Sequence, residues 1–575
     1  MRRIVAGATH LILLDAKRAF VRQWGAMKTL IIGLDGGTWD LFGPLCDLDV
    51  TPNLAALRER SAWSSLRSTQ PPFTAPAWAS FVTGVNPGKH GVLNFLQTEG
   101  SPAALLRGQG TPVNSTHIRA PLLWEYFDAH GRPTGALNVP LSYPLRPVKG
   151  FAISGMLTPP QARDWAHPPD LIRSLHDYLI DLDYGRPGQP LTLDDLPKPL
   201  DMLDDIIQMT ERRGVHALRL MQERAWDAFM VVFTGTDRIS HHFWHYLAPE
   251  YSDLAPRLDT RISAKLGDYF DLLDQLLGAL VKNAGPDAHI IILSDHGFGP
   301  AARHWVHLNN WLLELDLLRL RMGKAGWMQR LKRGAPWLTD ITKRILPREA
   351  RQAVKQHGSL ADAMDWENTL AWAMPLYNNV AGIYLHHTDH QPPGPVSPAA
   401  ASKLIDFIIE QAQSLRIPSA DVPLFTDIQL GWEVYHGPHA TRFPDIVLTM
   451  DPDYAAVPTL GSTLITPIPP GQILRSGDHR PEGMFLAAGP AIRPGRLHHS
   501  PRLIDLAPTI LHLADLPIPK SMDGRVIEAI FHARWLESHP PRPGPDLAPP
   551  EPASSLSPDE QKAIADRLRG LGYMT

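Results

Sequence analysis

Four short runs of apolar residues dominate the hydrophobic pattern, and each lies next to polar residues suited to chemistry. They cover residues 29–35, 228–237, 289–297 and 483–490. Continuous apolar runs of this length are typical of strands buried on both faces, which occur in mostly parallel sheets covered by helices. Amphipathic helical patterns, such as 201–224 and 266–285, separate the runs. The pattern predicts a three-layer α/β/α fold with a mostly parallel central sheet.

Changes in composition divide the chain into a core, an insertion and a tail. Between residues 301 and 470 the alternation stops, and the pattern predicts helical and irregular structure rich in Trp and Pro. Residues 538–558 are so rich in proline that we expect a linker there. The predicted regions are an N-terminal extension (1–27), a core (28–300 and 471–530), an inserted cap that binds substrate (301–470), the linker (538–558) and a C-terminal helix (559–575).

Charge and cysteine content narrow the function classes. A formal net charge of −4 over 575 residues and an isoelectric point near 6.7 argue against a dedicated nucleic-acid binder, which would carry a strong basic excess. Cys46 is the single cysteine, which excludes intramolecular disulfides and fits a reducing cytoplasm. The apolar run 4–14 is interrupted by His10 and lacks a convincing cleavage site. We therefore expect a cytoplasmic protein, with export as the alternative, and no transmembrane segment.

One segment departs from the balanced charge. Residues 319–355 contain eleven Lys or Arg against two acids, Asp340 and Glu349. A segment of this kind can contact an anionic surface such as lipid headgroups. A solvated helical face is the more common explanation of a basic run, so we expect at most a weak anionic contact.

Polar residues stand where the predicted strands end. Asp35 follows one strand directly, and Asp295 and His296 follow another. A carboxylate at the edge of a core is costly unless something pairs with it, although each residue alone also suits an ordinary helix cap. Because ligands bind at the carboxyl ends of parallel strands, these positions are candidates for a common site.

Two further segments add histidines to this set. Asp237 and His241 are four residues apart, so on a helical turn both side chains would lie on one face and could reach one cation. His242 and His245 are rival ligands that spacing does not separate from His241. His479 lies in a loop bounded by Gly and Pro, just before a predicted strand.

Together these residues predict a metal centre. Three carboxylates and three imidazoles gathered at one sheet edge would be mutually unsatisfied, whereas two divalent ions would neutralise the carboxylates and bind neutral imidazoles. Oxygen and nitrogen ligands without thiolates favour zinc, or manganese, over calcium.

Thr74 is the candidate nucleophile. It lies just ahead of a predicted helix in PPFTAPAWASFVTG, where a hydroxyl is usually a helix cap. A metal beside it would lower the pKa of the hydroxyl, and helix amides would bind phosphoryl oxygens.

The ordered motifs from Lys28 to Ile527 resemble the alkaline phosphatase superfamily, in particular its type I phosphodiesterase/nucleotide pyrophosphatase branch and the bacterial predicted phosphohydrolases or phosphomutases close to it. The resemblance rests on IIGLDGGTWD, TPNLAALRERSAW, PPFTAPAWASFVTGVNPGKHG, TGTDRISHHFW, ILSDHGFGP, GDHRPEGMFLAAGP and IDLAPTILHLADLPIPKSMDGRVI. Each motif alone is modest, but the ordered set is specific.

The resemblance implies a role for each candidate residue. One metal ion would be bound by Asp237, His241 and His479. The second would be bound by Asp35, Asp295, His296 and the Thr74 oxygen. Thr74 would form a covalent phosphothreonine, which water would then hydrolyse. Asn94 lies near the position of a phosphate-contacting Asn in the family, and the other candidate phosphate contacts are Lys89, His90, Arg303 and Arg480.

The implied function is a two-metal phosphoric-ester hydrolase, of the phosphodiesterase or nucleotide pyrophosphatase type, acting on a small-molecule phosphate ester. A phosphomutase of the same superfamily is the alternative, because it uses a similar metal core. A sulfatase is disfavoured, since Trp78 stands where the sulfatase motif needs Arg. A binding protein with an inactive core is disfavoured because every expected ligand is present.

Overall fold

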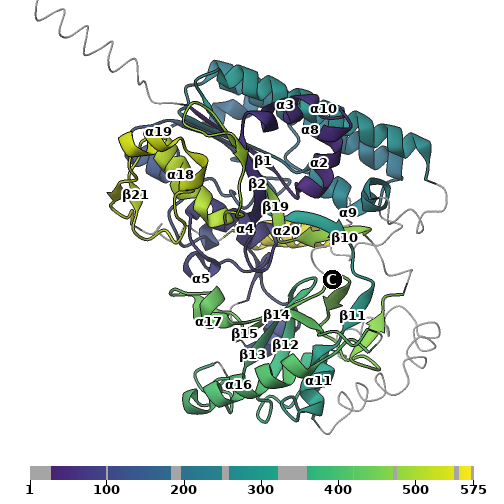
Figure 1. Cartoon of the computed structure of the whole chain (residues 1–575). Coiled ribbons are helices and arrows are strands. Elements are labelled where there is room, and N and C mark those ends of the chain that lie inside the picture. The colour runs from purple at the N-terminus through teal and green to yellow at the C-terminus, as the bar shows by residue number, and fades with distance from the viewer. Residues whose placement is uncertain are drawn as a thin grey trace, which may run out of the picture.

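The computed structural model of the chain describes residues 28–98, 101–182, 196–248, 258–321, 359–390, 392–418, 420–469, 475–548 and 556–570. The predictions for residues 1–27 and for most of the basic segment 319–355 lie outside these ranges. The described residues form two lobes, the upper one in Figure 1 with the large sheet and the lower one with a smaller sheet.

A nine-stranded sheet forms the centre of the larger lobe, in the order β20-β2-β19-β9-β1-β8-β5-β6-β7. Its strands are β1 (Thr29–Leu34), β2 (Ala62–Arg67), β5 (Thr134–Val139), β6 (Phe151–Ser154), β7 (Ala166–His167), β8 (Ala228–Phe233), β9 (His289–Leu293), β19 (Glu482–Ala488) and β20 (Gly495–Arg496). The five strands β9, β1, β8, β5 and β6 run parallel, which confirms the predicted mostly parallel sheet. β19 differs, because it pairs antiparallel with both β9 and β2.

Helices cover both faces of this sheet, because its strands are apolar on both sides. In β1, Leu30, Ile32 and Leu34 face one hydrophobic core, and Ile31 faces the other. The first core is covered by α2 (Trp39–Asp47), α3 (Pro52–Glu59), α8 (Pro199–Glu223), α9 (Gly235–Leu247) and α10 (Thr260–Ala284). The second is covered by α4 (Thr74–Thr83), α7 (Leu123–Ala129), α18 (Leu506–Leu513) and α20 (Pro558–Gly570). The predicted three-layer α/β/α fold is therefore confirmed.

The smaller lobe has its own sheet and its own hydrophobic core. Its four antiparallel strands, in the order β12-β13-β15-β14, are β12 (Ala371–Tyr377), β13 (Val380–Leu385), β15 (Ile446–Met450) and β14 (Phe425–Leu430). Residues of α11 (Leu308–Glu314) and α16 (Pro398–Ser414) share the hydrophobic core of this sheet. The prediction of helical and irregular structure for 301–470 is thus wrong in part, since it missed these strands. The role of this region as a cap for substrate stays a prediction.

The C-terminal helix α20 packs back onto the larger lobe. Ile564 and Leu568 are fully buried in the core on the α4 face. The helix begins as its sequence predicts, because the backbone N–H and hydroxyl of Ser557 donate to Glu560, whose own N–H donates back to the Ser557 hydroxyl. Within the proline-rich linker, β22 (Pro543–Gly544) pairs with β21 (Ile518–Pro519), so part of it is regular structure.

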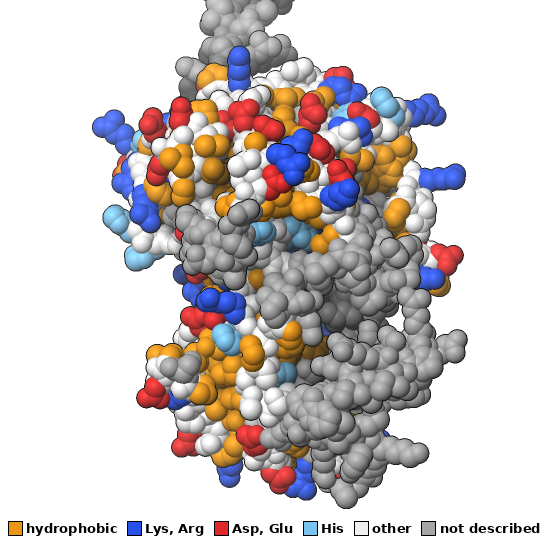
Figure 2. Space-filling view, turned by 90° about the vertical axis from the view of Figure 1, so that its right-hand side faces the viewer, with side chains coloured by type: hydrophobic (Ala, Val, Ile, Leu, Met, Phe, Trp, Pro, Cys, Tyr) orange, Lys and Arg blue, Asp and Glu red, His pale blue; other side chains and the backbone are white. Residues whose placement is uncertain are grey.

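The surface agrees with the nearly balanced charge. On the face shown in Figure 2, basic and acidic side chains are interspersed over the larger lobe. None of the helices in the described part of the chain combines the length and apolarity that crossing a bilayer requires.

Candidate active site

The seven residues predicted from the sequence as metal ligands and nucleophile lie together at the carboxyl edge of the central sheet. Asp35 directly follows β1, Asp295 and His296 follow β9, and Asp237 and His241 lie on α9 after β8. Thr74 begins α4. His479 comes from β18 (Gly477–Arg480), which pairs antiparallel with β10 (Gly297–Pro300). It therefore lies in a strand, not in the predicted loop. None of the seven residues is more than 2% exposed.

The first group of side chains gathers around His296. Its Nε2 lies 3.2 Å from Asp295 Oδ2 and 3.6 Å from Asp35 Oδ1. The hydroxyl oxygen of Thr74 lies 3.3 Å from the same nitrogen. Asp35, Asp295 and His296 form one of the groups whose ligand atoms all lie within 4.8 Å of one another. These are the residues that the resemblance assigns to one metal ion.

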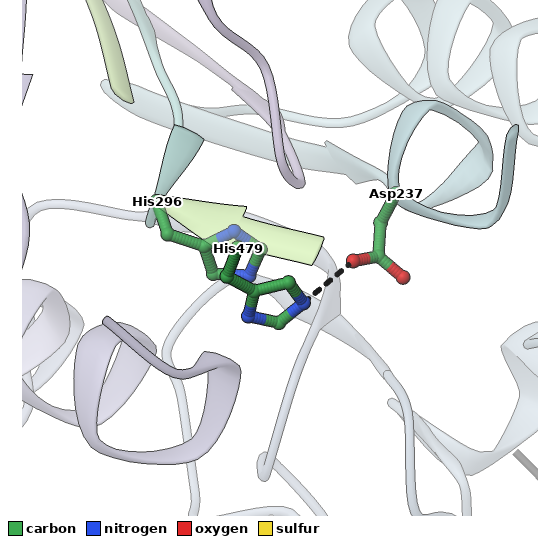
Figure 3. Close-up of side chains that lie close together, drawn as sticks. All are labelled: Asp237, His296 and His479. Carbon is green, nitrogen blue, oxygen red and sulfur yellow. Dashed lines mark ion pairs between the residues drawn. The ribbon is translucent and has the colours of Figure 1, made fainter. Parts of the chain in front are cut away.

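The second group gathers around Asp237. Its Oδ1 lies 3.4 Å from His241 Nε2 and 3.3 Å from His479 Nε2, the latter pair marked in Figure 3. The two Nε2 atoms are 3.1 Å apart. The rings of His479 and His296 stack with their centroids 3.5 Å apart, and Asp237, His296 and His479 also form a group of possible ligands. The two groups are therefore neighbours in one buried cluster.

The histidines are oriented by backbone carbonyls. Each Nδ1 lies near a carbonyl oxygen, and the pairs are His241 with Gly477 (3.1 Å), His296 with Gly297 (3.1 Å) and His479 with Pro72 (3.2 Å). Because a carbonyl only accepts, each Nδ1 carries the hydrogen and donates it. The Nε2 atom of each neutral ring therefore presents a lone pair to the cluster. A neutral imidazole with a free lone pair is the form of histidine that binds metals.

The carboxylates show the complementary arrangement. One oxygen of each faces a protein donor, in the pairs Trp78 Nε1 to Asp35 Oδ2 (3.3 Å), Gly36 N to Asp295 Oδ1 (3.2 Å) and Arg238 Nη1 to Asp237 Oδ2 (3.4 Å). The other oxygen of each faces imidazole Nε2 atoms. Within the described part of the chain, Asp35 Oδ1 and Asp295 Oδ2 are buried and accept no hydrogen bond.

These atoms fit divalent cations. Carboxylate oxygens and Nε2 lone pairs are all acceptors, so atoms of these two kinds facing each other in a buried site repel unless a positive charge lies between them. Ligand atoms about 2.0–2.2 Å from a tetrahedral ion are about 3.3–3.6 Å apart. The distances around His296 and Asp237, from 3.1 to 3.6 Å, lie within or just below this range.

Electrostatics without a cation show how unfavourable the cluster is by itself. Burial, together with the neighbouring Asp295 and Asp237 charges, raises the pKa of Asp35 well above its usual value. Burial likewise raises the pKa of Asp295 to about 8. Burial lowers the pKa of His479 to about 3 and lowers those of His241 and His296 far below normal. The carboxyls of Asp35 and Asp295 thus resist ionisation, and the three imidazoles stay neutral.

Thr74 is not the cap of its helix. Phe73 occupies the capping position of α4, and its side chain offers no hydrogen bond. The first N–H groups of a helix have no partner within it, and Pro76 has no N–H. The amides of Thr74 and Ala75 are therefore the donors that this helix end offers next to the Thr74 hydroxyl.

Several residues at the site were missed by the sequence reasoning. Trp78 and Arg238 face candidate ligand carboxylates as donors, and neither follows a motif with a fixed spacing. Tyr377 comes from the smaller lobe and stacks on Phe73, with centroids 4.3 Å apart, and lies 4.5 Å from the His479 ring. Only a signal for the β12–β13 hairpin could have drawn attention to Tyr377, because its two ring contacts join it to residues about one hundred and about three hundred positions away in the sequence.

The structure does not bring every candidate phosphate contact into the cluster. Lys89 pairs with Asp523 at 2.5 Å and donates to the Ser521 carbonyl, so its contacts do not support a substrate role. The Arg480 guanidinium donates to the carbonyls of Pro300 and His479.

The remaining candidate phosphate contacts and the rival metal ligands also have defined positions in the structure. His90 is buried beside the Ser80 hydroxyl, and Arg303 pairs with Asp453. Asn94 lies beside Phe95, whose ring contacts Phe73 at 4.7 Å. The rivals His242 and His245 belong to none of the ligand groups found among the described residues.

Comparison with known proteins identifies the family of the chain. A sequence model of the type I phosphodiesterase / nucleotide pyrophosphatase family matches residues 29–479. The chain belongs to this family. The resemblance inferred from the motifs is confirmed, and membership places the chain among the phosphoester hydrolases, as predicted. All seven clustered residues lie within the matched range.

No curated protein matches the chain in sequence. Among solved structures, phosphonoacetate hydrolase from Sinorhizobium meliloti 1021 in complex with phosphonoacetate is similar over 84% of this chain and 95% of its own, with 16% identity and a TM-score of 0.48. Human ectonucleotide pyrophosphatase / phosphodiesterase 5 is similar over 88% of this chain and 100% of its own, with 14% identity and a TM-score of 0.46.

Proposed function

We propose that this member of the family is a two-metal phosphodiesterase or nucleotide pyrophosphatase in which Thr74 forms a covalent phosphothreonine. The observation that carries the proposal is the buried cluster in which acceptor atoms face acceptor atoms, at distances suited to shared cations. A threonine hydroxyl lies within 3.3 Å of one of those atoms.

Two divalent ions, zinc or manganese, fit this cluster. Asp237, His241 and His479 would hold one ion, and Asp35, Asp295, His296 and the Thr74 oxygen would hold the other. When bound, such ions supply Lewis-acid stabilisation of the charge that develops during phosphoryl transfer. The surrounding donors keep one oxygen of each carboxylate occupied, so that the other is directed to the cation.

The chain's own residues provide the nucleophile and its alignment. Helix α4 is buried along its whole length, which fixes the direction of the Thr74 hydroxyl. The amides of Thr74 and Ala75 at its first turn would hold phosphoryl oxygens, as helix N-termini do. Little general-base chemistry by side chains is required.

The proposed reaction has two transfers. In the first, Thr74 Oγ1 bonds to phosphorus, the bond to the leaving oxygen breaks, and the hydroxyl proton is lost to solvent while the leaving alkoxide takes up a proton. In the second, water bonds to phosphorus and the Thr74–phosphorus bond breaks. Thr74 regains its proton, and phosphate or a phosphomonoester leaves.

The test compares variants at two threonines of the same helix. Thr74→Ala should abolish hydrolysis of a chromogenic phosphodiester such as bis(4-nitrophenyl) phosphate while leaving most bound metal in place. Thr83→Ala is the matched control, since its hydroxyl is equally buried but donates only to the Ala79 carbonyl. Metal content is measured by elemental analysis, and the phosphothreonine by mass spectrometry of acid-quenched protein.

The outcomes separate the alternatives. Normal turnover by Thr74→Ala would remove Thr74 from its role. A phosphomutase would isomerise a phosphorylated substrate without releasing phosphate, so a screen of monoesters, diesters, nucleotides and phosphonates decides between the two activities. The natural substrate, the metal used in the cell and the cytoplasmic location stay predictions.

A further inference from the structure

Three buried arginines converge on one short segment beside the metal-ligand cluster. Arg213 of α8, Arg238 of α9 and Arg567 of α20 are no more than 6% exposed. Arg213 donates to the carbonyls of Leu179 and Ile180, and Arg567 donates to those of Asp181 and Thr158. Burying a guanidinium is costly unless its donors and its charge are matched. The segment 179–181 supplies backbone carbonyl acceptors for the guanidinium donors and one carboxylate that balances their charge.

The carboxylate of Asp181 links this segment to the candidate ligands. Its side chain is fully buried, with Oδ2 accepting from Arg238 Nη2 at 2.8 Å and Oδ1 accepting from the Leu182 N–H at 2.9 Å. The other terminal nitrogen of Arg238 faces Asp237 Oδ2 at 3.4 Å. A continuous series of contacts therefore runs from Arg567 through Asp181 and Arg238 to Asp237.

The arrangement matters because Asp237 must leave Oδ1 for a cation. An uncompensated guanidinium at this distance would attract both oxygens of Asp237 and repel a divalent ion nearby. Asp181 neutralises Arg238 and holds it with Nη1 facing Asp237 Oδ2. Burial alone would raise the pKa of Asp181, but Arg238, Arg567 and Arg213 lower it below the usual value, so the carboxylate stays charged.

We propose that Asp181 is a positioning residue for the cation held by Asp237, His241 and His479, and that the C-terminal helix α20 keeps Asp181 in place through Arg567. The inference rests on the proposed two-metal function. It assigns the tail helix, which lies far from the nucleophile in the sequence, a part in assembling the metal centre.

The test is a metal titration of the full-length protein, with zinc competed against a chromophoric chelator. In Asp181→Asn the side chain keeps its shape but has a single acceptor oxygen, so either Arg238 or the Leu182 N–H loses its partner. We expect the affinity for one of the two ions to fall by about ten- to a hundredfold, the usual effect of removing a residue that orients a ligand. The affinity for the other ion should change little.

A second variant tests the tail. Arg567→Met keeps the alkyl chain and removes the donors, and we expect a loss at the same ion. If Arg567 acts through Asp181, the double variant should lose no more affinity than Asp181→Asn alone. Raising free zinc by about a hundredfold should restore kcat in both single variants, with KM unchanged.

Arg132→Met is the control for a loss of stability alone. Arg132 also pairs with a carboxylate, Asp227, and donates to a carbonyl, that of Ala514, but Asp227 precedes β8 at the opposite edge of the sheet. Arg132→Met should lower the urea concentration at the unfolding midpoint, while the affinities for both zinc ions stay at the wild-type value.

The outcomes distinguish the two levels of the argument. Wild-type protein that binds no divalent ion contradicts the proposed function itself. Wild-type protein that binds two ions, together with Asp181→Asn that binds both equally well, overturns the positioning role alone. If Asp181→Asn does not fold, Arg567→Met decides by the same criterion.

Discussion

Removing the metal should make the contribution of Asp35 and Asp295 to stability fall as pH rises, which is the reverse of the usual behaviour of acidic groups. Without a cation, burial raises the pKa of Asp295 to about 8, from an ordinary value of 3.8 in the unfolded chain. The folded protein therefore holds a proton on this carboxyl that the unfolded chain has already lost. Asp35 shifts in the same direction, with burial as the largest cause and Asp295 next.

The magnitude follows from linkage. A group whose pKa is raised by folding contributes stability that is fully present below its unfolded pKa and is lost as pH rises through its folded pKa. For Asp295 the window extends from about pH 4 to about pH 8, and each pH unit corresponds to about 1.4 kcal/mol. The upper bound is about 6 kcal/mol. Coupling between Asp35 and Asp295 makes a loss of a few kcal/mol the expected result.

The assay is urea unfolding in chelator and in excess zinc, at several values between about pH 5 and about pH 8. Below about pH 6.5 the lowered pKa values of His241, His296 and His479 act in the opposite direction, so the contribution of the carboxyl is measured as the difference in free energy of unfolding between the wild type and Asp295→Asn. In chelator this difference should decrease steadily across this range. In zinc it should not, because the cation takes the place of the protons, and its affinity increases as the carboxyls ionise. The stabilisation by zinc should therefore be largest near pH 8.

The variant Asp295→Asn isolates the contribution of one carboxyl. An amide does not ionise here, so in chelator the variant should lose less stability than the wild type as pH rises, while the histidine contributions are the same in both proteins. A variant whose stability has the same pH dependence as that of the chelated wild type would refute the reasoning.

Three further substitutions test individual contacts. Gly36→Ala places a Cβ 2.6 Å from the Phe298 ring at a φ of +68°. In urea unfolding it should lower stability by about 2 kcal/mol or more, and it should weaken metal binding. Gly108→Ala is the control, since Gly108 has a φ of +63° in open space and the variant should show only the cost of the left-handed backbone. Trp78→Phe removes the donor to Asp35 Oδ2 and should cost about 1–3 kcal/mol, with reduced zinc affinity in chelator competition. Lys89→Met should lower stability by about 1 kcal/mol and leave KM unchanged in steady-state kinetics, because the ammonium is engaged by Asp523.

The parts of the structure that the sequence predicted share a physical cause. The runs at β1, β8 and β9 are apolar on both faces, so their burial between two layers of helices could be read from composition alone. Polar residues that follow neighbouring parallel strands lie at the same edge of the sheet, and Asp35 and Asp295 both lie at this edge. His479 could be assigned only through the ordered motifs, since one histidine near a glycine carries no information by itself.

The missed parts depend on contacts between distant positions. In the smaller lobe, β12 gives a weak strand signal because it contains Pro375. Yet β12 and β13 are separated by just two residues, Asn378 and Asn379, which is the length of a tight hairpin. That spacing was the available signal. No local signal exists for the pairing of Asp181 with Arg238, fifty-seven positions apart.

The hairpin between β12 and β13 ties the smaller lobe to the metal-ligand cluster. The Tyr377 hydroxyl donates to Asp478, the residue before His479, and the Tyr377 ring lies against both Phe73 and the His479 imidazole. Because His479 is held on its other side by the Pro72 carbonyl, a displacement of the hairpin must either break the bond to Asp478 or move a candidate ligand. The smaller lobe is therefore part of the wall of the site. Because Tyr377 joins this lobe to a candidate ligand, we expect substitutions in residues 371–385 to alter metal affinity.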